Sequence, residues 1–284
     1  MPPRSTPTTR QERLGVELYR MREAAAMTAR DAAKLLGVDP AKISHIEAGR
    51  VGVSEERLRR LAAFYSCSDT ALIDALSAMT HEQRGQGWWE EYRGILPAPF
   101  LDLSELEHHA SYLQAIQITD IPGLFQTEDY ARAIFGCTVP QLPQAELEAR
   151  VAHRMERQKI LLREEPPTYE AIIHEAVLRM HFGGRKVVRA QLAHLLEQGD
   201  RPGITVRVVP FTTEEYMGAN RTMLYAGTAV PKLDTVQIET AVGVTFLDAE
   251  SQLKRYRTLF QTAEIAALGV TESHDFVHAI SREL

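Results

Sequence analysis

Apolar residues recur at helical spacing through the first 80 positions of the chain. Leu14, Leu18, Met21 and Ala25 lie three or four residues apart and predict an amphipathic helix over roughly residues 8–26. Shorter helices are predicted over residues 29–36, from residue 40, and over residues 55–66 and 70–79. Each is preceded by a side chain that can cap a helix start, and these caps are Thr28, Asp39, Ser54 and Asp69. The pattern predicts an all-α domain of five short helices.

The second and third predicted helices are joined by a short turn of specific chemistry. Gly37 follows "ARDAAKLL", where a left-handed residue ends a helix without steric cost. Pro40 stands in the first turn of the next helix, where its missing N–H does no harm. Ala33 is small enough for the third helix to approach the second. The third helix would be held in place by apolar anchors at Val38, Ile43 and Ile46. This is the arrangement of a helix-turn-helix.

The other side of the third helix is small or polar and would be presented to a DNA groove. Lys42 can donate to guanine acceptors or phosphate, and Ser44 and His45 can bond base edges or backbone oxygens. Three further residues at helix ends suit phosphates, which position the protein without reading sequence. The predicted DNA-binding residues are Thr28, Arg30, Pro40, Ala41, Lys42, Ser44, His45 and Arg50. The alternative is a helical bundle whose polar face is simply solvated.

These motifs resemble a known family. The segment "LGVELYRMREAAAMTARDAAKLLGVDPAKISHIEAGRVGVS" is similar to the Xre-type helix-turn-helix domain of phage repressors and Cro, over about the first 80 residues. The resemblance implies a structural ion pair between Arg22 of the first helix and Glu47 at the end of the recognition helix. A solvated Glu47 is the alternative. The chain departs from the family at Ala29, where Gln is common, so specificity would depend on the third helix.

Beyond residue 100 the periodicity becomes mixed. Residues 103–118 are predicted to be a helix that turns into a strand. Short β-rich runs bounded by Pro, Gly or Asp predict strands near residues 168–175, 204–210, 221–227, 235–240 and 243–248. Helical patterns separate them, including residues 128–136, 144–164, 189–198 and 249–268. The prediction is an α+β domain, with a small sheet covered by helices.

The same region carries a second resemblance. The motifs "DIPGLFQTEDYARAIF", "RVAHRMERQKIL", "IIHEAVLRMHFGG", "VRAQLAHLLE" and "ITVRVVPF" look like those of an actinobacterial domain of unknown function, over about residues 90–280. That domain usually follows an Xre-type domain in antitoxin-like regulators of the Scr-type and WhiJ-like group. The resemblance implies a regulator, often encoded beside a small partner protein, and supplies no catalytic residues.

Length and charge agree with two domains. At 284 residues the chain is long for one core. We expect a flexible leader (1–10), a helix-turn-helix DNA-binding domain (11–85), a linker or hinge (86–100) and an α+β regulatory and dimerisation domain (101–284). Residues 1–85 hold 13 Lys and Arg against 11 Asp and Glu, whereas the remainder holds 19 against 27. The first part therefore has a net charge of +2 and the rest −8, which favours nucleic-acid binding near the N-terminus.

Other classes of chemistry find little support. No apolar run approaches the roughly 20 residues of a membrane span, no secretory signal begins the chain, and Cys67 and Cys137 lack metal or disulfide spacing. "HEAVLRMH" (174–181) differs from a zinc-protease helix because its second His comes seven residues after the first rather than four. His274 and His278 lack an evident third ligand, and Glu107, His108 and His109 are similarly unsupported as a metal site. We expect a cytoplasmic protein, no catalytic residues, no metal and no cofactor.

The sequence therefore predicts a DNA-binding transcriptional regulator, not an enzyme. We expect it to bind double-stranded DNA as a homodimer, with a C-terminal domain that dimerises and senses an unknown small-molecule effector or a partner protein. The alternative is an antitoxin-like protein that sequesters a small protein encoded by a neighbouring gene, with DNA binding for autoregulation.

Overall fold

The computed structural model describes residues 7–81, 87–214, 222–240 and 243–284. The chain divides into two compact units, one of Met1–Glu90 with Val230–Leu233 and one of Glu91–Ala229 with Asp234–Leu284. Parts of the predicted segments lie outside the described residues: 1–6 of the leader, 82–85 of the DNA-binding domain, 86 of the linker, and 215–221 and 241–242 of the α+β domain, with 221 also the first residue of a predicted strand. Within the described residues, no helix is both long and apolar enough to cross a membrane.

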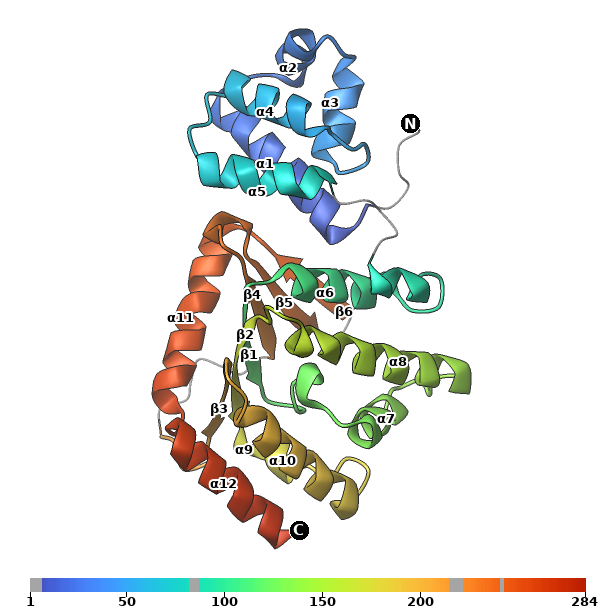
Figure 1. Cartoon of the computed structure of the whole chain (residues 1–284), viewed down its shortest axis with the longest axis vertical. Coiled ribbons are helices and arrows are strands. Elements are labelled where there is room, and N and C mark those ends of the chain that lie inside the picture. Colours follow the sequence, from blue (N-terminus) through green and yellow to red (C-terminus); the bar gives the residue numbers. More distant parts are fainter. Residues whose placement is uncertain (1–6, 82–86, 215–221, 241–242) are drawn as a thin grey trace. The chain divides into compact units, whose positions relative to one another are not determined.

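The first unit contains five α-helices within residues 7–81 (Figure 1), and each begins close to its predicted position. They are α1 (Thr9–Ala24), α2 (Ala29–Leu36), α3 (Pro40–Glu47), α4 (Glu55–Phe64) and α5 (Thr70–His81). Two end earlier than predicted, because Ala26 after α1 and Ser66 after α4 take left-handed conformations, each with φ 52°. A helix cannot continue through such a residue.

One hydrophobic core joins these five helices. Leu18 of α1, Ile43 and Ile46 of α3 and Leu58 of α4 are all buried within it. Val38 is only partly buried and packs against the same core. Burial of the two isoleucines fixes which face of α3 points inward, and therefore which face points out.

Two glycines bring the backbones of α1 and α3 unusually close. A Cβ on Gly15 would lie 2.4 Å from the carbonyl oxygen of Glu47 and 2.7 Å from that of Ile46. Gly49 has φ 68°, and a Cβ there would lie 2.9 Å from the backbone of Gln11 and Glu12. These contacts leave no room for a side chain on either residue, so α3 is seated directly against the main chain of α1.

The second unit is built on a six-stranded mixed sheet of order β3-β2-β1-β4-β5-β6. The strands are β1 (Tyr112–Gln117), β2 (Thr168–His174), β3 (Ile204–Val209), β4 (Met223–Gly227), β5 (Thr235–Thr240) and β6 (Gly243–Leu247). β1, β2 and β3 run parallel, and β4, β5 and β6 continue the sheet in antiparallel pairs on the other side of β1. β1 is thus the strand at which the pairing changes from parallel, with β2, to antiparallel, with β4.

Helices cover both faces of this sheet (Figure 1). The helical elements of the second unit are α6 (Ala98–His109), η2 (Gly123–Phe125), α7 (Glu128–Gly136), α8 (Gln144–Arg157), η3 (Gln158–Leu162), α9 (Glu175–Arg179), α10 (Arg185–Gly199), α11 (Glu250–Ala266) and α12 (Val270–Glu283). Of the other 3-10 elements, η1 (Trp88–Tyr92) spans the boundary between the two units and η4 (Pro231–Leu233) falls in the first unit. Leu253 and Phe260 of α11 pack on one face, against Ile116 and Tyr225. Residues of η2, α10 and α12 pack on the other face.

The predicted fold classes are therefore confirmed: a helical helix-turn-helix region followed by a sheet packed with helices. The helix predicted over 144–164 is wrong in its last third, because α8 ends at Arg157 and a 3-10 turn follows. The predicted linker is also partly structured, since η1 occupies Trp88–Tyr92 and α6 begins at Ala98.

Candidate nucleic-acid interface

The turn between α2 and α3 is closed by local hydrogen bonds. Gly37 ends α2 with φ 65° and ψ 40°, and its N–H and that of Val38 bond to carbonyls of the last turn. Asp39 then caps α3, its Oδ1 accepting from the N–H of Ala41 at 2.7 Å. Only a left-handed residue at 37 allows the chain to turn this tightly. The two helices are consequently held at a fixed angle.

The outward residues of α3 are accessible. Pro40, Ala41 and Ser44 are exposed, whereas Lys42 and His45 are partly buried. The side chains of Lys42, Ser44 and His45 make no hydrogen bond or ion pair with another described residue. This leaves three polar groups on one exposed helix face with their hydrogen-bonding capacity unused. A helix presented in this way can enter a major groove.

Two arginines lie at the ends of these elements. Arg30 is in the first turn of α2 and Arg50 follows α3, and both are exposed. Neither guanidinium forms a hydrogen bond or salt bridge within the described parts of the chain. They are free to approach phosphates.

Thr28, a predicted DNA-binding residue, is exposed and caps the start of α2. Its hydroxyl accepts from the N–H of Asp31 at 3.2 Å and lies 2.5 Å from the Asp31 carboxylate, which also accepts from the Thr28 N–H at 3.1 Å. This capping box uses both polar groups of the residue. Hydrogen bonds from Thr28 lower the pKa of Asp31, so a carboxylate charge lies beside the hydroxyl. Any phosphate contact by Thr28 would compete with its helix cap.

Arg22 and Glu47 form an ion pair at the C-terminal end of α3. Arg22 Nε donates to Glu47 Oε1 at 2.7 Å and Nη2 donates to Oε2 at 3.1 Å. Both side chains are about nine-tenths buried, and the hydrogen bond with Glu47 is the largest cause of the raised pKa of Arg22. Arg22 Nη1 also donates to the carbonyl of Met27, in the loop before α2. One guanidinium therefore ties together α1, the end of α3 and the start of α2.

Two residues that position α3 could not be identified from the sequence. Gly15 has the close backbone contact described above, yet it stands in a helix where glycine is otherwise unfavourable. Tyr65 is buried next to the ion pair, and its hydroxyl has no hydrogen-bond partner among the described residues. Burial and the charge of Glu47 raise the pKa of Tyr65 to about 12. An interior glycine in α1 was the one available signal, because it breaks an otherwise good helix pattern.

Two other polar residues noted in the sequence, His174 and Glu107, have structural hydrogen bonds in the second unit. His174 caps α9 by accepting from the Ala176 N–H at 3.2 Å. Glu107 accepts two hydrogen bonds from Arg157, at 2.5 and 2.9 Å, in a buried pair. Among the described residues, no three His, Cys, Asp or Glu side chains come together as a metal site requires.

Two protein families match the chain. Residues 13–76 match the family described as a helix-turn-helix domain. Residues 100–279 match the family described as a domain of unknown function, DUF5753. No curated protein matches the chain, and no solved structure does. Because the second match spans more than half of the 284 residues, it establishes the family. The chain belongs to the DUF5753 family and carries a helix-turn-helix domain ahead of that domain.

Proposed function

We propose that this protein is a sequence-specific, Xre-type transcriptional regulator that reads DNA with α3. A helix-turn-helix domain indicates a DNA-binding regulator rather than an enzyme. The observation that carries the finer proposal is the division of α3, in which Ile43 and Ile46 are buried while Lys42, Ser44 and His45 lie outward without partners. Lys42 and His45 would contact base edges, and Arg30 and Arg50 would contact phosphates.

The second domain would dimerise and receive a signal. A single short recognition helix discriminates few base pairs, at about 1–3 kcal/mol for each good contact. Two copies that bind half-sites about 34–36 Å apart would multiply this discrimination. An interface with a second copy would bury exposed apolar side chains of this domain, including Ile265 and Phe211. The signal would be a small-molecule effector or a partner protein.

An antitoxin-like role is the second candidate. The same exposed side chains would then bind a small partner protein, and DNA binding would serve autoregulation. Co-purification of the product of a neighbouring gene in a defined complex distinguishes this role from dimerisation.

The test is binding of the purified full-length protein to its own promoter region over a range of salt concentrations. We expect affinity to fall steeply with salt, because the cations at the helix ends displace counterions from phosphates. Absent binding at low salt, or binding insensitive to salt, would overturn the proposal.

Two matched double variants test which face reads the sequence. Lys42→Ala with His45→Ala should remove the preference for the promoter over unrelated DNA. Lys254→Ala with His278→Ala removes the same side-chain types from exposed positions of the second unit and should leave the preference unchanged. If discrimination survives in the first variant, the assigned reading face is wrong.

A further inference from the structure

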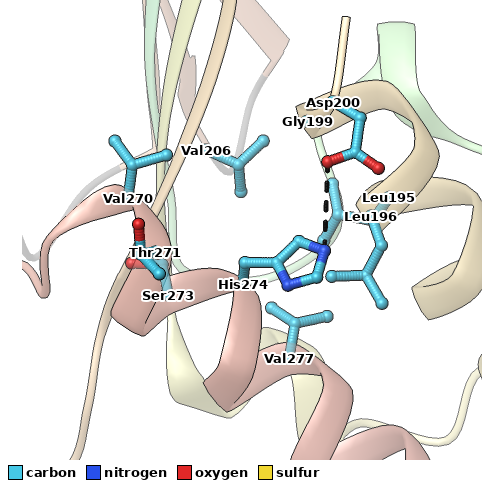
Figure 2. A pocket seen from close by; sticks show the side chains of 10 residues that line it. All are labelled: Leu195, Leu196, Gly199, Asp200, Val206, Val270, Thr271, Ser273, His274 and Val277. Atoms are coloured by element: carbon cyan, nitrogen blue, oxygen red, sulfur yellow. Dashed lines mark ion pairs between the residues drawn. The ribbon is translucent and has the colours of Figure 1, made fainter.

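A cavity of about 240 Å³ opens in the second unit between α10, β3 and α12 (Figure 2). Its walls are mainly apolar and include Leu195, Leu196, Val206, Val270 and Val277. Leu195 and Val277 are each 1% exposed, so they belong to the core and form a rigid floor. The cavity is therefore formed by the packed elements of the fold, not by loose surface side chains.

The cavity is large enough for a small organic molecule. An apolar cavity of about 150 Å³ can hold benzene. At about 240 Å³, this one has room for a ring or a branched chain with one substituent. Gly199 contributes to this space, because even a Cβ there would come only within 3.8 Å of Val206. A large side chain at Gly199 would extend into the cavity.

The polar residues that line the cavity are Asp200, Thr271, Ser273 and His274, and only Asp200 among them is acidic. His274 points toward Asp200, with Nε2 lying 3.9 Å from Oδ1 (Figure 2). Its Nδ1 lies 3.9 Å from Asp275 Oδ1. Both separations exceed hydrogen-bond length, and the two carboxylate side chains are 73% and 81% exposed. The hydroxyl of Ser273, by contrast, already accepts from the Val208 N–H at 2.9 Å. The polar groups left to bind a ligand are thus the Asp200 carboxylate, the His274 imidazole beside it and the Thr271 hydroxyl.

We propose that this cavity binds a small organic cation, with an aromatic or branched aliphatic body between α10 and α12 and a protonated amine at Asp200. The apolar walls match the body, and the rim carboxylate matches the charge. A carboxylate-bearing ligand of the same shape would be repelled by Asp200. The binding itself is independent of DNA. Its role as the regulatory signal rests on the proposed function.

Three probes of similar shape and different charge test this site: benzylamine, benzyl alcohol and benzoate. Titration of the full-length protein, followed by methyl NMR signals of Leu195, Val206 and Val277, measures each affinity. We expect saturable binding whose affinity is highest for benzylamine, lower for benzyl alcohol and lowest for benzoate. No saturable shift with any probe, or equal affinity for benzoate and benzylamine, would overturn the proposal.

Variants separate the apolar and charged parts of the site. Gly199→Leu should abolish binding of every probe by filling the cavity. Asp200→Asn should weaken benzylamine about fivefold, the most that an exposed ion pair commonly contributes, and leave benzyl alcohol unchanged. Asp129→Asn, at an exposed position of α7, should change neither. Binding that survives Gly199→Leu, or benzylamine affinity unaffected by Asp200→Asn, would place the probe elsewhere.

Promoter binding is measured in parallel. Benzylamine binding without promoter binding would contradict the proposed function alone. Promoter binding without probe binding would contradict this inference alone.

Discussion

The guanidinium of Arg22 and the carboxylate of Glu47 form two parallel hydrogen bonds across 25 positions of sequence, at 2.7 and 3.1 Å. The pair links the last turn of α1 to the last residue of α3, the helix that we propose reads DNA. Both charges are largely removed from water, so each depends on the other for compensation. Removing one partner should therefore cost more than removing both.

We expect Glu47→Gln to destabilise the first unit by about 3–5 kcal/mol, because it leaves the charge of Arg22 buried without its counterion. The double variant Arg22→Met with Glu47→Leu should lose less stability than Arg22→Met alone or Glu47→Leu alone. Hydrogen exchange of α1 and α3 amides in the full-length protein measures both effects. A double variant as unstable as the sum of the single variants would argue against coupling of this kind.

One substitution should have opposite effects at two helical glycines. Gly15→Ala should destabilise the first unit by about 1–3 kcal/mol, because the added methyl group meets the backbone carbonyls of α3. Gly136→Ala, in α7, has open space around its Cβ and should be neutral or stabilise by up to about 1 kcal/mol. Hydrogen exchange within each unit gives the two values. Equal effects at both positions would mean that α1 and α3 are not in backbone contact.

Tyr65→Phe should be tolerated or should slightly stabilise the first unit. The substitution removes a buried hydroxyl that has no hydrogen-bond partner among the described residues, and it keeps the ring. Tyr65→Ala should instead cost about 3–5 kcal/mol through loss of the packed ring. Thermal unfolding of the three proteins provides the comparison. A strong loss of stability in the Phe variant would show that the hydroxyl has a partner.

The second unit should lose stability in mild acid through His153. Burial, helped by Arg157 and Arg154, lowers the pKa of this histidine to about 3. Ser104 Oγ donates to the carbonyl of Phe100 and lies 3.0 Å from His153 Nε2, so the neutral imidazole donates to it. An unfolded histidine has a pKa near 6.5 and takes up a proton first as the pH falls. The contribution of neutral His153 to the free energy of unfolding is therefore complete above about pH 6.5 and decreases as the pH falls below that value.

Between pH 7.5 and pH 5.0 this group should cost the wild-type protein about 2 kcal/mol. His153→Gln should remove that part of the pH dependence, whatever it does to stability at pH 7.5. Urea unfolding of both proteins at the two pH values measures the difference. If both lose stability equally, His153 is not the titrating group.

Much of the local structure could be predicted because its causes are local. Thr28, Asp39 and Ser54 each cap the helix that follows them, and Gly37 ends α2 through its own φ angle. The strands β2 and β3 likewise follow short runs of β-branched and aromatic residues. Such signals need no knowledge of the rest of the chain.

What could not be predicted depends on contacts between distant segments. The pairing of Glu107 with Arg157 joins α6 to α8, and nothing in the sequence around Glu107 indicates its partner. The place of β4 beside β1 depends on the whole connection between them. The position of Arg22 against Glu47 was suggested only by a family resemblance, since spacing alone does not specify an ion pair across three helices.

The residues that seat α3 and those that face outward are different residues. Ile43, Ile46 and the glycine contacts of α1 fix where the helix lies, whereas the side chains of Lys42, Ser44 and His45 form no hydrogen bond or ion pair with another described residue. The outward positions can therefore be randomised together in a selection for new operators while the protein still folds. Descendants of one ancestral gene could diverge in target choice by the same route, with their stability unaffected.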